Sequence, residues 1–266
     1  THHYRARRMN KVQLDYRKTR SGLYILKKED FDDIAFMVLK EYQPIMLTKA
    51  QPLDVDDFIY ERLFLDMKTA RLSVDGRILG VIAFDDTTYD GFDCYGRPIE
   101  IQMPVGTILL EESLMNDPHH VGRQRFTKMH EASHWICHRQ YHVPLEGRNY
   151  EFRVKDDTRS IACRMERIEH PGQSEGASRK WSDIEWEEWQ ADNMAAALLM
   201  PKVTFIQAVR EVMASYGIYD GNPLYWENDL TVSHRIVDDL KSIYNVSKSA
   251  VELRMVRCGL LVRENC

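Results

Sequence analysis

Two histidines and a glutamate in an HExxH arrangement constrain this chain more than any other feature. The pattern is His130-Glu131-Ala132-Ser133-His134, and it lies inside segment 125–138, whose residues follow a helical period. Residues four apart on a helix lie one above the other, about 6 Å along the axis, so two imidazoles can bind one metal ion. Glu131 is rotated about 100° from His130, which makes it a poor third ligand but brings it within reach of a water on that metal.

The donor atoms of this motif favour zinc, Zn²⁺, as the cofactor. Neutral imidazole is a good zinc ligand at pH 7, and zinc lowers the pKa of a bound water to about 7. A carboxylate beside that water can take its proton and pass it to a leaving amine, so Glu131 is the candidate general base. The alternative at this point is an ordinary helix that carries two surface histidines without a metal.

A second segment, 188–201, supplies what the first motif lacks. Catalytic zinc usually has three protein ligands and one open position, and Glu188 can provide the third ligand. Asp192, one helical turn further on, can accept the free ring N–H of a ligand histidine and so fix its tautomer. Ser182 and Glu185 form a capping box that predicts the start of this helix, and Pro201 marks its end.

Together the two segments read Arg-Phe-Thr-x-x-His-Glu-x-x-His-Trp-x-x-His at 125–138 and Glu-x-x-Ala-Asp-x-x-Ala-Ala-x-Leu-Leu-Met-Pro at 188–201. The HExxH helix with a downstream ExxxD helix is the gluzincin pattern, and these sequences resemble the ImmA/IrrE family of zinc metallopeptidases. That family usually has Asn at the position of Asp192 and Phe at the position of Met194. The 53 residues between His134 and Glu188 are more than many members have.

The resemblance implies a zincin-like fold in which His130, His134 and Glu188 bind zinc and Glu131 is the catalytic base. It also implies a protein substrate, a DNA-binding repressor of the helix-turn-helix class, and hence a role in transcription regulation. A second function remains open, that of a zinc-containing regulatory module that sequesters a partner without cleaving it. The intact Glu131 favours the enzyme, because a pure binding site does not need the base.

Composition narrows the class of protein. With 266 residues, 44% hydrophobic and 29% charged, the chain is expected to be a globular protein, and no apolar run approaches the roughly 20 residues that cross a bilayer. Its five cysteines are odd in number and widely spaced, and no secretory signal is visible, so we expect free thiols and a cytoplasmic location. The net charge of −5 argues against direct, general binding of nucleic acid.

The pattern of apolar residues predicts an α+β fold, with a small, mostly antiparallel sheet packed on helices. Segments 31–42 and 55–64 are expected to be helices. Segment 72–84 predicts two strands joined by a turn at Asp75-Gly76. Segment 106–111 predicts a further strand, and it is the candidate edge strand that receives an extended substrate beside the metal-binding helix.

Three regions follow from the order of these patterns. Residues 1–20 form a basic N-terminal arm, residues 21–228 the metallopeptidase domain with an insertion at about 140–181, and residues 229–266 a helical extension that resembles a helix-turn-helix. Within the insertion, Tyr150–Val154 and Ser160–Cys163 are expected to form a hairpin over the active-site cleft. We expect the insertion and the extension to recognise the partner protein, because both adjoin the site helices in the sequence.

Other candidate residues have weaker support. His138 continues the stripe of His130 and His134, but it lies about 12 Å along the axis from His130 and is too far to share one metal ion with it. Cys137 is expected to be a buried thiol beneath the site. His234 is a candidate for stabilising an oxyanion.

Overall fold

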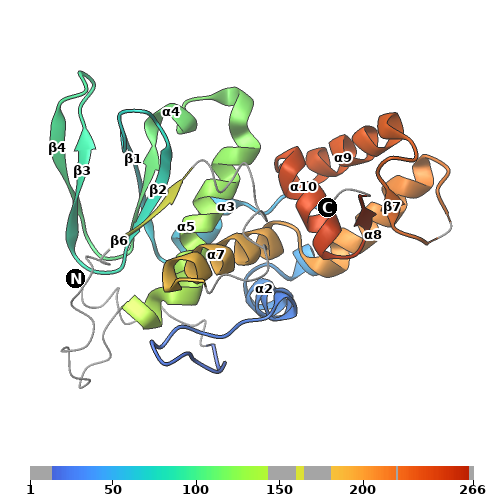
Figure 1. The fold of residues 1–266 in the computed structure, drawn as a ribbon, viewed down its shortest axis with the longest axis horizontal. Coiled ribbons are helices and arrows are strands. Elements are labelled where there is room, and N and C mark those ends of the chain that lie inside the picture. Colours follow the sequence, from blue (N-terminus) through green and yellow to red (C-terminus); the bar gives the residue numbers. More distant parts are fainter. Residues whose placement is uncertain (1–13, 143–159, 165–180, 220, 264–266) are drawn as a thin grey trace.

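Two long helices form the centre of the fold. The computed structural model describes residues 14–142, 160–164, 181–219 and 221–263. Helix α5 (Val121–His142) contains the HExxH motif, and helix α7 (Asp183–Leu199) contains the second motif and packs along α5. The strands between residues 66 and 111 lie on one side of these helices, and the C-terminal helices lie on the other (Figure 1). The fold is α+β, as predicted.

The sequence patterns for helices are confirmed in large part. Helix α2 (Lys28–Tyr42) covers the predicted 31–42 segment, and its first turn carries Glu29 and Asp30 near the positive end of the helix dipole. The predicted helix at 55–64 consists of α3 (Val55–Asp57) and a π-helical turn, η2 (Phe58–Arg62). The other helical elements are η1 (Pro44–Leu47), α4 (Glu112–Met115), η3 (Pro118–His120), α8 (Lys202–Ser215), α9 (Leu230–Tyr244) and α10 (Lys248–Arg257).

Four strands form the main sheet in the order β1-β5-β2-β6. Their bounds are β1 (Asp66–Ala70), β5 (Thr107–Glu111), β2 (Ile78–Ala83) and β6 (Ser160–Arg164). Strands β1 and β5 are parallel, whereas β2 is antiparallel to both β5 and β6, so the sheet is mixed. Two small sheets accompany it, an antiparallel hairpin of β3 (Thr87–Phe92) with β4 (Pro98–Met103) and a parallel pair of β7 (Leu224–Tyr225) with β8 (Leu261–Val262).

The predicted hairpin at 72–84 is wrong. The chain does turn at Gly76, which has a positive φ of 66°, and β2 follows it. The strand before the turn is β1, which ends at Ala70 and pairs with β5 instead of β2. Leu72 lies between the end of β1 and the turn, and its backbone N–H donates to the Glu111 carboxylate at 2.8 Å. The turn is therefore at the predicted position. However, the strand before it (β1) and the strand after it (β2) are not neighbours in the sheet, because β5 lies between them.

The prediction of 106–111 as an edge strand is also wrong. Strand β5 lies inside the sheet between β1 and β2, and all five of its residues are buried. Its run Ile108-Leu109-Leu110 is typical of a strand that is covered on both faces. The edges of the sheet, within the described ranges, are β1 and β6. Strand β6 belongs to the predicted insertion, and the expected partner strand at 150–154 lies outside the described residues.

One hydrophobic core extends from the N-terminal helix to the C-terminal helices. Its large buried side chains include Phe31 of α2, Trp135 of α5, Phe205 of α8 and Tyr244 of α9. On α7, a run of alanines (195–197) is buried against this core and allows the helix to approach its neighbours closely. The predicted boundary at 228/229 therefore falls inside a continuous core, and it stays a prediction.

A backbone contact joins the start of α5 to the turn between α9 and α10. A Cβ atom on Gly122 would lie 2.5 Å from the carbonyl carbon of Val246 and 2.6 Å from the nitrogen of Ser247, so only glycine fits there. One turn further along α5, Arg125 donates from Nε to the carbonyl oxygen of Asn245 at 2.9 Å. The first turn of α5 is thus held directly by the C-terminal segment.

Two expectations from composition can be compared with the structure. Within the parts of the chain that are described, no helix has the length and apolar character required to cross a membrane. Cys94, Cys137 and Cys258 are free thiols, and Cys137 is buried on α5, three residues after His134. Burial raises the pKa of the Cys137 thiol to about 12, so this residue stays protonated and unreactive.

Candidate metal centre

The two histidines of HExxH face each other through their Nε2 atoms. His130 and His134 are completely buried on α5, and their Nε2 atoms lie 3.0 Å apart. Two nitrogens bound to one tetrahedral zinc ion at about 2.0–2.1 Å would lie roughly 3.3 Å apart. The spacing of four residues on a regular helix therefore brings the imidazoles close to the separation of two ligands of one ion.

Helix α7 brings the carboxylate of Glu188 to the same place. One oxygen of Glu188 is 3.5 Å from His130 Nε2, and the other is 3.9 Å from His134 Nε2. The donor atoms of all three residues lie within 4.8 Å of one another, and all three residues are buried. The structure thus brings together the three residues that the sequence predicted as metal ligands.

Asp192 contacts the outer side of His130, also as predicted. Its Oδ1 atom is 2.9 Å from His130 Nδ1. A carboxylate can only accept a hydrogen bond, so Nδ1 carries the proton and the lone pair is on Nε2, which faces His134 and Glu188. This is the tautomer that a metal ligand requires.

His138 contacts the other ring nitrogen of His134 and is not part of the group that His130, His134 and Glu188 form. Its Nδ1 is 3.0 Å from Nδ1 of His134, and its Nε2 is 3.1 Å from the side-chain oxygen of Gln190. Burial lowers the pKa of His138 to about 3, and the nearby His142 acts in the same direction. The imidazole is therefore neutral at physiological pH. The contact of Gln190 with His138 was not predicted from the sequence. The one signal for it was the position of Gln190, two residues after Glu188 on the same helix.

A second group of possible metal donors shares His134 with the first. It consists of His134, His138 and Glu187. However, Glu187 is already in contact with His142, whose Nε2 lies 2.5 Å from a Glu187 oxygen, and both nitrogens of His138 have protein partners. Within this second group, His138 is therefore better explained as a hydrogen-bonded support for His134, and Glu187 as the partner of His142.

Glu131 lies at the site with its carboxyl group completely buried. Neither of its carboxyl oxygens has a hydrogen-bond partner within the described ranges. Burial raises the pKa of Glu131 to about 8; His130 opposes this shift and Glu188 adds to it. A buried carboxyl group without a hydrogen bond costs free energy, so its position indicates a function other than packing.

Strand β2 passes directly against Glu131 at a glycine. A Cβ atom on Gly80 would lie 2.6 Å from Oε1 and 2.8 Å from Cγ of Glu131, and both distances are shorter than a van der Waals contact. The lack of a side chain at Gly80 thus gives the Glu131 carboxyl group its place between α5 and the sheet. The sequence predictions did not include this residue, because the two positions are far apart along the chain.

Gly80→Ala is expected to displace the Glu131 carboxyl group without removing a metal ligand. We expect zinc content to stay near that of the wild type, while any activity that depends on Glu131 falls steeply. The overpacking itself should cost about 1–3 kcal/mol of stability. Gly91→Ala in β3 is a matched control, because a Cβ there would lie 2.5 Å from the side chain of Ile101 in β4, and β3 and β4 form a sheet separate from that of β2. Equal losses of activity per folded molecule in both variants would contradict the role of Gly80.

His234 is not placed as the sequence suggested. It lies on α9, where its ring packs edge-on against Trp226 with 4.9 Å between ring centres. Helix α9 contacts α5 at Asn245, its C-terminal cap, whereas His234 lies near the N-terminal end of the same helix. The structure therefore gives no support for His234 as the residue that stabilises an oxyanion.

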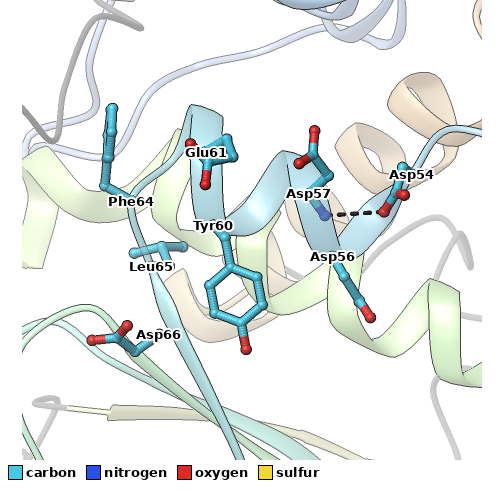
Figure 2. A pocket seen from close by; sticks show the side chains of 8 residues that line it. All are labelled: Asp54, Asp56, Asp57, Tyr60, Glu61, Phe64, Leu65 and Asp66. Atoms are coloured by element: carbon cyan, nitrogen blue, oxygen red, sulfur yellow. Dashed lines mark hydrogen bonds between the residues drawn. The ribbon is translucent and has the colours of Figure 1, made fainter.

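A surface pocket of about 430 Å³, shown in Figure 2, is lined by none of the candidate metal ligands. Its lining residues are Asp54, Asp56, Asp57, Tyr60, Glu61, Phe64, Leu65 and Asp66. Asp56 pairs with Lys128 of α5 at 2.7 Å. Lys128 precedes His130 by two residues, or about 200° around the helix, so the pocket faces the opposite side of α5. The pocket is acidic, and it is separate from the site.

The described geometry therefore defines a class of site: a buried group of two histidines and one glutamate, with an aspartate behind one histidine and a second glutamate beside the cluster. No model of a protein family matches the chain, and a search of curated proteins finds no match.

Proposed function

We propose that this protein is a zinc-dependent endopeptidase with a zincin-like core, of the kind found in the ImmA/IrrE family. The observation that carries the proposal is the convergence of His130 Nε2, His134 Nε2 and the Glu188 carboxylate within 4.8 Å of one another. The contact of Asp192 with His130 Nδ1 supports it, because a carboxylate behind a ligand histidine is the usual outer partner in zinc sites.

The donor set fits a cation, and zinc in particular. A nitrogen lone pair of His130 and a carboxylate of Glu188 point into a space that is closed to solvent, where like partial charges repel strongly unless a positive charge lies between them. Two imidazoles and one carboxylate are a known donor set of catalytic zinc sites with one open position. His130, His134 and Glu188 would therefore hold the ion.

The chemistry follows from the residues around these ligands. Bound zinc would supply a Lewis acid that polarises a peptide carbonyl group and makes water acidic. Glu131 would take the proton of the attacking water and pass it to the leaving amine.

The sheet limits how a substrate can bind. Because β5 is an interior strand, an extended peptide cannot add to it. The strand beside Glu131 is β2. One edge of β2 pairs with β5, and the other edge pairs with β6. A peptide bound as an extra strand near the site would pair with β6 or take its place. By resemblance to the family, we propose that the substrate is a DNA-binding repressor, and the insertion that contains β6 is a candidate for its recognition.

One observation favours a second function. His130, His134 and Glu131 are completely buried, and Glu188 is nearly so. Structural zinc sites are closed in this manner, whereas catalytic sites keep an open position. A zinc-containing module that binds a partner without cleaving it is therefore the second candidate.

Metal removal tests the first proposal. The full chain is incubated with a mixture of unstructured peptides, and the products are identified by mass spectrometry. We expect cleavage to stop when a strong chelator removes the metal and to return when about one equivalent of zinc is added. Cleavage that persists in the metal-free protein would contradict the zinc mechanism. A zinc-loaded chain that cleaves neither the peptides nor a partner captured from cells would favour the second candidate.

A further inference from the structure

A line of hydrogen bonds leads from a backbone carbonyl group to the second zinc-ligand candidate. Gln190 donates from Nε2 to the carbonyl oxygen of Tyr24 at 2.8 Å. The other atom of this amide, Oε1, is 3.1 Å from Nε2 of His138. Nδ1 of His138 is 3.0 Å from Nδ1 of His134. The side chains of Gln190, His138 and His134 are all buried, so water does not compete for these contacts.

The first member of this line determines the direction of every bond in it. A carbonyl oxygen can only accept, so the Gln190 amide must turn its NH₂ group to Tyr24 and its oxygen to His138. An amide oxygen also only accepts, so Nε2 of His138 carries a proton. A neutral imidazole has one N–H, which leaves Nδ1 of His138 as an acceptor. His134 must then donate from Nδ1, and its Nε2 keeps a lone pair.

Neutral His138 is consistent with its surroundings. The ring is fully buried, and its Nε2 partner is an amide instead of a carboxylate, so a charge on it would be poorly compensated. The nearby carboxylate of Glu187 contacts His142, on the next turn of α5. A protonated His138 would donate to His134 from Nδ1 and reverse the last bond in the line.

We propose that Gln190 and His138 are positioning residues that hold His134 as its Nδ1–H tautomer, with the Nε2 lone pair facing the metal site before a metal arrives. They do for His134 what Asp192 does for His130. The inference deepens the proposed function, since it rests on His134 as a metal ligand, but it does not depend on peptide cleavage. The outer partner of His130 would thus be a charged carboxylate, that of Asp192, and the outer partner of His134 would be the neutral imidazole of His138.

The tautomer can be observed directly. In full-length protein with ¹⁵N-labelled histidine, long-range ¹H–¹⁵N correlation spectra distinguish Nδ1–H from Nε2–H. We expect His134 to be protonated on Nδ1 and His138 on Nε2 in both metal-free and zinc-loaded wild type. In Gln190→Leu, metal-free His134 should shift toward the Nε2–H form, which neutral imidazole side chains favour in water. Metal-free wild type with His134 protonated on Nε2 would overturn the proposal.

Metal affinity gives a second and independent test. Competition with a chelator of known zinc affinity measures the dissociation constant of wild type, His138→Leu and His138→Asn. Loss of an outer partner weakens metal binding about 10–100-fold, and we expect this loss in His138→Leu. Asparagine can place an oxygen acceptor near the position of Nδ1, so His138→Asn should recover most of the affinity.

Several outcomes would count against the positioning role. Equal loss in both variants would show that His138 acts only through packing, and unchanged affinity in both would show that the line is not needed. Binding of two zinc ions by wild type and one by His138→Asn would assign His138 to a second metal site. If His138→Leu does not fold, as judged by circular dichroism, Gln190→Leu takes its place in the same comparison. A protein that binds zinc but cleaves nothing would remove the proposed enzyme and leave this inference intact.

Discussion

Glu131→Gln is expected to keep about one zinc ion per chain and to lower peptide-bond cleavage by about 10²–10⁴-fold. Glutamine has nearly the same shape as glutamate, so the fit of the side chain against Gly80 is preserved. The amide cannot take a proton from water, and the general base is therefore lost. Zinc content by atomic absorption and initial rates on an unstructured peptide would measure the two effects separately.

The same variant separates the two candidate functions. If the protein is a peptidase, Glu131→Gln should hold its protein substrate without cleaving it, and a pull-down from cells should enrich a full-length partner that wild type cuts. If the protein is a binding module, wild type and Glu131→Gln should capture the same intact partner and regulate target genes equally well. The second result would contradict the proposed enzyme.

Glu188→Ala is expected to weaken zinc binding by more than about 100-fold, beyond the 10–100-fold effect of an outer partner. Glu188 is the only candidate that brings a negative charge directly to both Nε2 atoms, at 3.5 and 3.9 Å, within the described residues. Without it the ion would have two neutral protein ligands. Chelator competition measures the affinity, and the zinc content of purified protein gives a first indication.

Glu187→Ala is the matched control for this experiment. Glu187 is the neighbouring residue on α7, is equally buried, and contacts His142 instead of the Nε2 atoms of the site. The control should keep its zinc even if it loses stability. Full zinc retention in Glu188→Ala would remove the third ligand, and loss of zinc in Glu187→Ala alone would move the metal to the group of His134, His138 and Glu187.

The parts of the fold that could be predicted are those with a local signal. Helices α2 and α7 carry regular apolar spacing or a capping box, and the structure has both near the predicted bounds. Strand β1 has the sequence Asp-Met-Lys-Thr-Ala, without apolar alternation, and it was missed. The position of β5 inside the sheet could not be predicted, because strand order depends on pairings between distant segments.

In the candidate site too, the residues that could be predicted are those that belong to a local sequence pattern. The spacing of His130 and His134 on one helix, and of Glu188 and Asp192 on another, fixes which side chains share a face. That was sufficient to predict the residues that the structure brings together. Gly80 and Gln190 were not predicted. Their contacts with Glu131 and with the backbone of Tyr24 join parts of the chain that no periodic pattern connects.

The contact of Gly122 with the backbone at Val246 and Ser247 has a thermodynamic consequence. Two backbones that touch without side chains between them cannot separate gradually, since separation exposes peptide groups on both. The start of α5 and the α9–α10 turn should therefore open together and exchange their amide hydrogens as one cooperative unit. A ligand that binds only the folded form of α5 then protects the C-terminal helices too, because its binding free energy adds to the opening free energy of the whole unit.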